Sequence, residues 1–407
     1  MSGTDYLRIW YRAQVSIALF CVAVIGGWEF YHHLPFVPWM IIMAVILVLA
    51  LVAEAYDLPR WLQAVNRWVQ CLLQPIILVV VWAIMTREII VRLQLPPRGV
   101  MVITMTYYVV MFAPMAGIIG GQLQWTLARL FYPFWWFSIV TGIVGVIYPA
   151  KFAGPHLFAL ILQTGALGAL ALFLMMVAAM RAWHLSWPGI NPQFGRGFSW
   201  LSLAILLGLG GLFIFINAFS SGDSVKNLLT SYSFTTFHPN REYLLTAFEA
   251  GVAEETLCRF GFLGVCLYAL RNFRWQILGA VLLTSALFGA LHLGNLVEQP
   301  LAITILQTIS AFGMGLYFAV VYLYTGQLWL AMLLHFLLDW LAFSTSGSTA
   351  MMGNPTLADW YLLAVEVLFF TGITIWMFLG DRYQVMERHA RRLTGENQRF
   401  DYRLTFE

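Results

Sequence analysis

The sequence predicts an all-α fold, a polytopic transmembrane helical bundle of about twelve spans. The first observation is composition, because 61% of the residues are hydrophobic and only 10% are charged, whereas a soluble domain has about 25% charged residues. The second is that uncharged runs such as 99–128, 152–180 and 197–222 recur, each long enough for a helix of about 20 residues to cross a bilayer. These runs are continuous rather than alternating, which argues against an outer-membrane barrel.

The expected spans follow from these runs, which lack the polar stripe of a soluble amphipathic helix. They lie near residues 14–31, 36–56, 67–86, 100–122, 125–149, 156–181, 198–220, 243–270, 275–293, 300–325, 327–345 and 358–380. The first run has no small-residue cleavage site and is expected to remain as an anchor. We therefore expect a multi-pass integral membrane protein, of a bacterial inner membrane.

Basic residues in short loops favour the cytoplasmic side and predict the orientation. An even number of spans places most of them on one side, with both termini cytoplasmic. These residues are Arg8, Arg12, Arg60, Arg67, Arg181, Arg196, Arg271, Arg274, Arg382, Arg388, Arg391, Arg392, Arg399 and Arg403. Arg87, Arg92 and Arg98 are the exception, since the same parity places them outside.

The chain divides by its polar residues. We expect N-terminal transmembrane helices of unassigned role (1–220), an extramembrane loop (221–242), a catalytic helical core (243–345), a final transmembrane helix (346–380) and a basic cytosolic tail (381–407). The four cysteines lie in apolar runs and predict neither a disulfide framework nor a zinc knuckle.

Most of the intramembrane ionisable residues belong to the expected core. Such groups are costly in a bilayer, so they usually pair with one another or line a watery cavity, and they mark functional sites. The first motif runs from Glu254 to Arg259. Within it, Glu255 can reach Arg259 because residues four apart share a helix face. Glu254 points about 100° away from Glu255. The expected division is an ion pair made by Glu255 and a cavity-facing Glu254.

Two further motifs follow on separate helices. Phe288 and His292 are four residues apart and place an apolar wall beside an imidazole, while small Gly289 allows a neighbouring helix to approach closely. His335 and Asp339 also share one helix face.

A structural interpretation competes with chemistry at each position. A single intramembrane His is commonly an interhelical hydrogen-bond partner, and an isolated Glu–Arg pair can simply join helices. We assign Glu54, Glu249 and Glu366 to that class. The core motifs differ because two His, two Glu, one Arg and one Asp lie in phase on three helices within about 90 residues, as a catalytic cluster would.

The ordered set EExxxR, FxxxH and HxxxD, each in its own predicted helix, resembles the CPBP family of intramembrane proteases, also called the type II CAAX prenyl endopeptidase or Rce1-like family. The resemblance covers about residues 243–345. It departs from the prenyl proteases at Asp339, where they carry Asn, a variation that is common among bacterial members.

The resemblance implies an intramembrane endopeptidase that acts on a membrane-associated protein or peptide, with the lipid bilayer as its other partner and no nucleic acid. Glu254 with His292 would activate water, and His335 with Asp339 would stabilise the oxyanion. Phe288 would contact the substrate. Glu255 and Arg259 would complete the catalytic group.

Three alternatives stay open at this stage. Two His and two carboxylates could hold zinc in a metalloendopeptidase, although the lack of HExxH and the nearby Arg259 favour an enzyme with no cofactor. A proton-coupled transporter could use the same residues as a relay, but the sequence shows no inverted repeats. A membrane scaffold would need no ordered acid, base and oxyanion set.

Overall fold

The computed structural model describes residues 3–33, 35, 37–186, 197–221, 225–351 and 353–395. Within these ranges the regular elements are helices. One isolated antiparallel bridge also pairs Ser220 with Tyr232. The predicted all-α bundle is therefore confirmed. Three predicted basic positions, Arg196, Arg399 and Arg403, lie outside the described residues, as do residues 222–224 of the polar loop and 396–407 of the tail.

Ten helices of the described chain are long and apolar enough to cross a membrane, or eleven if a bent pair is one span. The bent pair is α7 (His156–Gln163) and α8 (Ala166–Ala182), which meet at 53°. Gly165 separates them with a φ of +75°, a conformation that glycine adopts without strain. The expected span 243–270 is also helical but consists of three consecutive segments, each shorter than a span.

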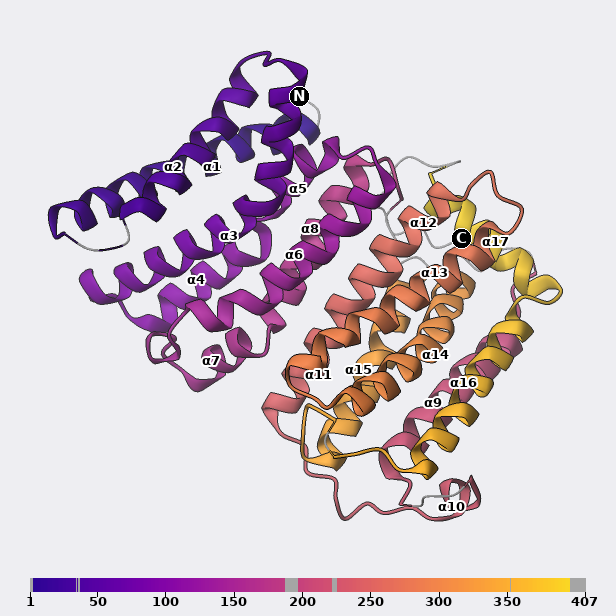
Figure 1. The fold of residues 1–407 in the computed structure, drawn as a ribbon. Helices are drawn as coiled ribbons and strands as arrows, with labels where there is room; N and C mark the ends of the chain where they lie inside the picture. Colours follow the sequence, from indigo (N-terminus) through magenta and orange to yellow (C-terminus); the bar gives the residue numbers. More distant parts are fainter. Residues whose placement is uncertain are drawn as a thin grey trace. The chain divides into compact units, whose positions relative to one another are not determined.

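The chain forms two compact units, residues 1–183 and 184–407. In the first unit the helices, besides α7 and α8, are α1 (Gly3–Tyr31), α2 (Val37–Ala55), α3 (Arg60–Arg92), α4 (Pro97–Val110), α5 (Ala113–Ile118), η1 (Gly120–Gln122), α6 (Thr126–Ile147) and η2 (Ala150–Phe152). Figure 1 shows them in indigo to magenta.

A proline in the middle of α3 shows how the first unit satisfies its backbone. Pro75 has no N–H, so the carbonyl of Cys71, four residues earlier, has no helical donor. The indole N–H of Trp136 on α6 donates to that oxygen over 3.0 Å, and the indole N–H of Trp135 donates to Leu72 O over 2.8 Å. In a bilayer, where water cannot supply the bond, neighbouring side chains must do so.

The second unit holds the predicted core. Its helices are α9 (Trp200–Phe219), α10 (Val225–Thr230), α11 (Arg241–Glu255), η3 (Thr256–Phe262), α12 (Leu263–Ala269), α13 (Gln276–Leu291), η4 (His292–Val297), α14 (Leu301–Thr325), α15 (Leu328–Ser346), α16 (Leu357–Met377) and α17 (Asp381–Leu393). Helix α14 packs against α13 and α16, and α11 packs against α15 (Figure 1). Every residue of α14 from Gly315 to Thr325 is buried.

Glycines bring these helices close together. A Cβ on Gly251 of α11 would lie 2.8 Å from the backbone nitrogen of Phe336 on α15. A Cβ on Gly289 of α13 would lie 2.6 Å from the carbonyl oxygen of Thr308 on α14. The close approach predicted at Gly289 is therefore present, and it follows the rule that membrane helices meet at small residues.

The Trp136–Cys71 bond predicts a double-mutant effect. Trp136→Phe should lower the free energy of unfolding by about 1–3 kcal/mol, because it leaves a buried carbonyl without a donor. In a Pro75→Ala background the new backbone N–H can serve Cys71 O, so the same substitution should cost less. Thermal unfolding in one detergent would measure both, and equal costs in the two backgrounds would contradict the proposed role of the indole.

Candidate active site

The helix that carries the first motif changes its winding at the site. It runs as α11 to Glu255, widens into the π-helical segment η3, and returns to α-helix at Leu263. π-helical segments are rare in proteins, and those that occur are often at functional sites. Arg259 lies within η3, and only 2% of its side chain is exposed. The sequence did not predict this segment, because its residues have no distinctive periodicity.

Glu255 joins two helices through its fully buried carboxylate. Its Oε2 lies 3.1 Å from Arg259 Nε, which is the ion pair that the sequence predicted. Its Oε1 lies 2.9 Å from Nδ1 of His335, which is 80 residues away on α15. The imidazole nitrogen is the donor in this bond, so His335 carries a proton on Nδ1. The link to His335 was not predicted, because nothing local to either motif indicates it.

Two aromatic rings enclose Arg259. The guanidinium carbon lies 4.2 Å from the ring centroid of Phe288 and 5.4 Å from that of Phe318. Arg259 Nη2 also donates to the carbonyl oxygen of Gly315 over 3.4 Å. Cation–π contacts in a desolvated site contribute about 2 kcal/mol, which helps to offset the cost of burying the charge.

The same two rings fix the imidazole of His335. Phe318 stacks on it with centroids 5.2 Å apart and an interplanar angle of 18°, and Phe288 meets it edge-on at 5.7 Å. The second ring nitrogen, Nε2, lies 3.4 Å from Asp339 Oδ2 and 4.0 Å from Glu254 Oε2. His335 is thus held at Nδ1 and by two aromatic rings, while Nε2 points toward two carboxylates.

Glu254 and Asp339 are the two carboxylates that retain some exposure, with 20% and 22% of their side chains accessible. Glu254 Oε2 itself is buried and has no hydrogen-bond partner in the part of the chain that the structure describes. Glu255 is paired with Arg259, as the sequence predicted, whereas a cavity beside Glu254 stays a prediction. A buried oxygen of this kind needs a donor, and water is the simplest one.

His292 follows the last residue of α13, and the ring of Phe288 lies between its ring and that of His335, with centroid distances of 5.3 and 5.7 Å. Its Nδ1 lies 3.1 Å from the carbonyl oxygen of Phe288. A carbonyl can only accept, so Nδ1 carries the proton and Nε2 is the free, basic nitrogen. Phe288 is itself 0% exposed and contacts His292, His335 and Arg259.

The acidic residues assigned to structural roles have partners in the structure. Glu366 of α16 accepts a 2.6 Å hydrogen bond from Ser310 of α14. Glu54 pairs with Arg8 and Arg12 in the first unit. Sequence reasoning missed Phe318 and Gly315, since one aromatic residue and one glycine among many on α14 give no signal of contact with Arg259.

The donor set does not fit zinc. Among the described residues, no group of three His, Cys, Asp or Glu side chains is arranged to hold a metal ion. Glu255 is not available as a ligand, because its two oxygens are engaged by Arg259 and by Nδ1 of His335. A buried guanidinium inside the cluster would also repel a divalent cation. A metalloendopeptidase is therefore not supported.

The site is a cluster of acidic and imidazole side chains, largely buried between helices of the second unit. Residues 228–341, which include all six ionisable residues, match the family model described as type II CAAX prenyl endopeptidase Rce1-like. This part of the chain is therefore similar to the Rce1-like family, whose description names peptide hydrolases. No curated protein and no solved structure shows a significant match to the chain.

The buried charges predict a stability effect. Glu255→Leu should lower the free energy of unfolding by about 3–5 kcal/mol, because it leaves Arg259 as an unpaired buried cation. The double variant Glu255→Leu with Arg259→Met should recover most of that loss, since no charge is stranded. Thermal unfolding in a fixed detergent would measure both, and a double variant as unstable as the single one would contradict the pairing.

Proposed function

We propose that this protein is an intramembrane endopeptidase in which Glu254 and His292 activate a water molecule and His335 stabilises the oxyanion. The observation that carries the proposal is the buried, unpartnered Glu254 Oε2, 4.0 Å from His335 Nε2. A gap of this width between two polar atoms suits a bridging water. The polar cluster of α11 and α15 thus offers a place for the nucleophile.

In the first step Glu254 takes a proton from the water as the oxygen attacks the peptide carbonyl. The other O–H of the water donates a hydrogen bond to Nε2 of His292, and this bond orients the attacking lone pair. The protonated Glu254 then gives its proton to the leaving amide nitrogen, so the acid and base roles alternate on one carboxylate. A positioned general base contributes about 10²- to 10⁴-fold to rate.

In the same step the carbonyl oxygen gains negative charge, which His335 stabilises. We assign His335 a proton on each ring nitrogen, because Nδ1 donates to Glu255 and Nε2 lies between Asp339 and Glu254. The Nε2–H then turns to the oxyanion, and one such donor is worth about 3–4 kcal/mol. Glu255 orients the ring, and Asp339 keeps the proton on Nε2.

The surroundings of the site limit the substrate. The proposed catalytic residues lie on α11, directly after α13, and on α15. The stretches 276–297 and 328–346, which carry His292 and His335, are apolar enough to cross a membrane. A substrate that arrives through the membrane suits such a site, either a lipidated C-terminal peptide or the transmembrane tail of another protein. The family description names prenyl endopeptidases, and we propose a membrane-associated polypeptide as the substrate of this chain.

Glu254→Gln should reduce cleavage by about 10²- to 10⁴-fold while the protein stays folded, because the amide keeps the shape of the side chain but cannot take the proton. Quantitative proteomics of membrane fractions that contain the wild type or the variant would measure this as the loss of specific new peptide termini. Glu366→Gln is the matched control, an intramembrane acid outside the cluster, and should leave those termini unchanged. Normal cleavage by Glu254→Gln would refute the mechanism.

Removal of metal ions should not change the rate, because no group of His, Cys, Asp or Glu among the described residues is arranged to hold a metal ion. Cleavage of a substrate identified in this way would be measured after dialysis against a chelator and again after zinc is restored. Loss of activity that zinc recovers would show that the enzyme is metal-dependent.

A further inference from the structure

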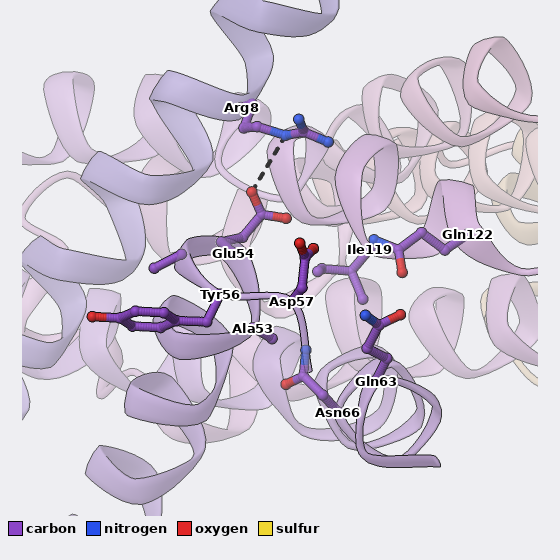
Figure 2. Close-up of a pocket in the computed structure, with 10 residues that line it drawn as sticks. Arg8, Ala53, Glu54, Tyr56, Asp57, Gln63, Asn66, Ile119 and Gln122 are labelled. Carbon is purple, nitrogen blue, oxygen red and sulfur yellow. Dashed lines mark ion pairs between the residues drawn. The ribbon is translucent and has the colours of Figure 1, made fainter. Parts of the chain in front are cut away.

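A polar cleft of about 400 Å³ lies in the first unit, far along the sequence from the catalytic motifs. It forms where α2 ends and α3 begins, beside the start of α1 and the end of η1 (Figure 2). Its lining residues are Arg8, Ala53, Glu54, Ala55, Tyr56, Asp57, Gln63, Asn66, Ile119 and Gln122. Polar groups dominate this lining, although the surrounding helices are strongly apolar.

The hydrogen bonds of α3 determine which end of the Asn66 amide faces the cleft. Gln70 Nε2 donates to the backbone carbonyl of Ile46 over 2.8 Å, so that atom must be the amide nitrogen. It also donates to Asn66 Oδ1 over 3.1 Å. Asn66, only 4% exposed, therefore directs its NH₂ toward the cleft (Figure 2), where it bonds to none of the described residues.

The same reasoning shows that the other lining groups present oxygens. Gln63 Nε2 donates to Leu58 O over 2.8 Å and Gln122 Nε2 donates to Ile118 O over 3.2 Å, so the carbonyl end of each amide is free. Asp57 makes no hydrogen bond or ion pair with the residues that the structure describes. The cleft is therefore rich in hydrogen-bond acceptors.

Glu54 adds a second carboxylate, whose side chain is only 9% exposed. Its Oε2 lies 3.3 Å from Arg8 Nε and 3.5 Å from Arg12 Nε, while its Oε1 makes no ion pair within the described chain. The two arginine side chains are about half exposed, at 51% and 50%. One side of the site thus offers anionic and carbonyl oxygens, and the other offers guanidinium groups to an anion.

Aromatic side chains place this end of the unit at the level of lipid headgroups. Tyr56, Trp61 and Trp125, which adjoin the cleft in sequence, are 70%, 69% and 72% exposed. Exposed Trp and Tyr side chains are typical of the membrane–water interface. A ligand that reaches the cleft from the bilayer would present its headgroup.

We propose that this cleft binds the phosphoethanolamine headgroup of a phospholipid, with the ammonium among Glu54, Asp57 and the amide oxygens, and the phosphate on Arg8 and Arg12. A primary ammonium has three N–H donors, which matches a site rich in acceptors. Arginine is well suited to phosphate oxygens. A choline headgroup has no N–H donor and could not form these hydrogen bonds.

The test compares two lipids on the full-length protein in detergent. Short-chain phosphatidylethanolamine should raise the unfolding temperature at a lower concentration than phosphatidylcholine with the same acyl chains. Asp57→Asn should raise the half-effective concentration of the ethanolamine lipid by roughly tenfold, since a charged hydrogen bond is lost. Asp57 is exposed and unpaired in the described chain, so this variant is expected to fold.

Glu88→Gln is the matched control, because Glu88 is an acid of the same unit at the other end of α3 and lies outside the cleft. It should keep the wild-type lipid preference. Equal stabilisation by the two lipids, or an unchanged preference in Asp57→Asn, would overturn the proposal. A third outcome would also overturn the proposal. If the protein showed no lipid preference, and Asp57→Asn raised the KM for the peptide substrate in phosphatidylcholine without other lipids, the cleft would instead bind a basic side chain of a polypeptide.

Discussion

The hydrogen bond between Glu255 and His335 is the interaction on which the polar cluster of the second unit depends. It joins α11 to α15, and through the Arg259 ion pair it also fixes the π-helical segment η3. A buried carboxylate in an apolar helix bundle is tolerated only when its charge is matched nearby. Because Glu255 matches Arg259 and orients His335 at once, the fold of this region and the geometry of the cluster have one physical cause.

The aromatic residues make that arrangement specific. Phe288 and Phe318 contact both the guanidinium of Arg259 and the imidazole of His335. The two rings therefore contact both side chains, which are 2% and 5% exposed and so largely shielded from water. Water can reach the partly exposed Glu254 and Asp339. In the proposed reaction the substrate carbonyl arrives on this side of the cluster.

A second constraint runs through both units: each polar group buried among apolar helices needs a partner from a neighbouring helix. In the first unit the indoles of Trp135 and Trp136 serve carbonyls near Pro75. Gln70 likewise serves the carbonyl of Ile46 and the amide of Asn66. Glu254 Oε2 is one of the buried polar atoms that have no such partner in the described chain, and it is the one beside which we propose a water molecule.

The sequence by itself determined the all-α membrane fold, the approximate positions of the apolar spans, the Glu255–Arg259 pair and the shared face of His335 and Asp339. These features depend on composition or on contacts within one helical turn, which local periodicity records. Only the tertiary structure decided that Glu255 also holds His335, that Phe318 stacks on that ring, and that Asn66 directs its amide nitrogen into a cleft. Each of these depends on which helices pack together and at what register, and in uniformly apolar spans the sequence pattern does not specify that register.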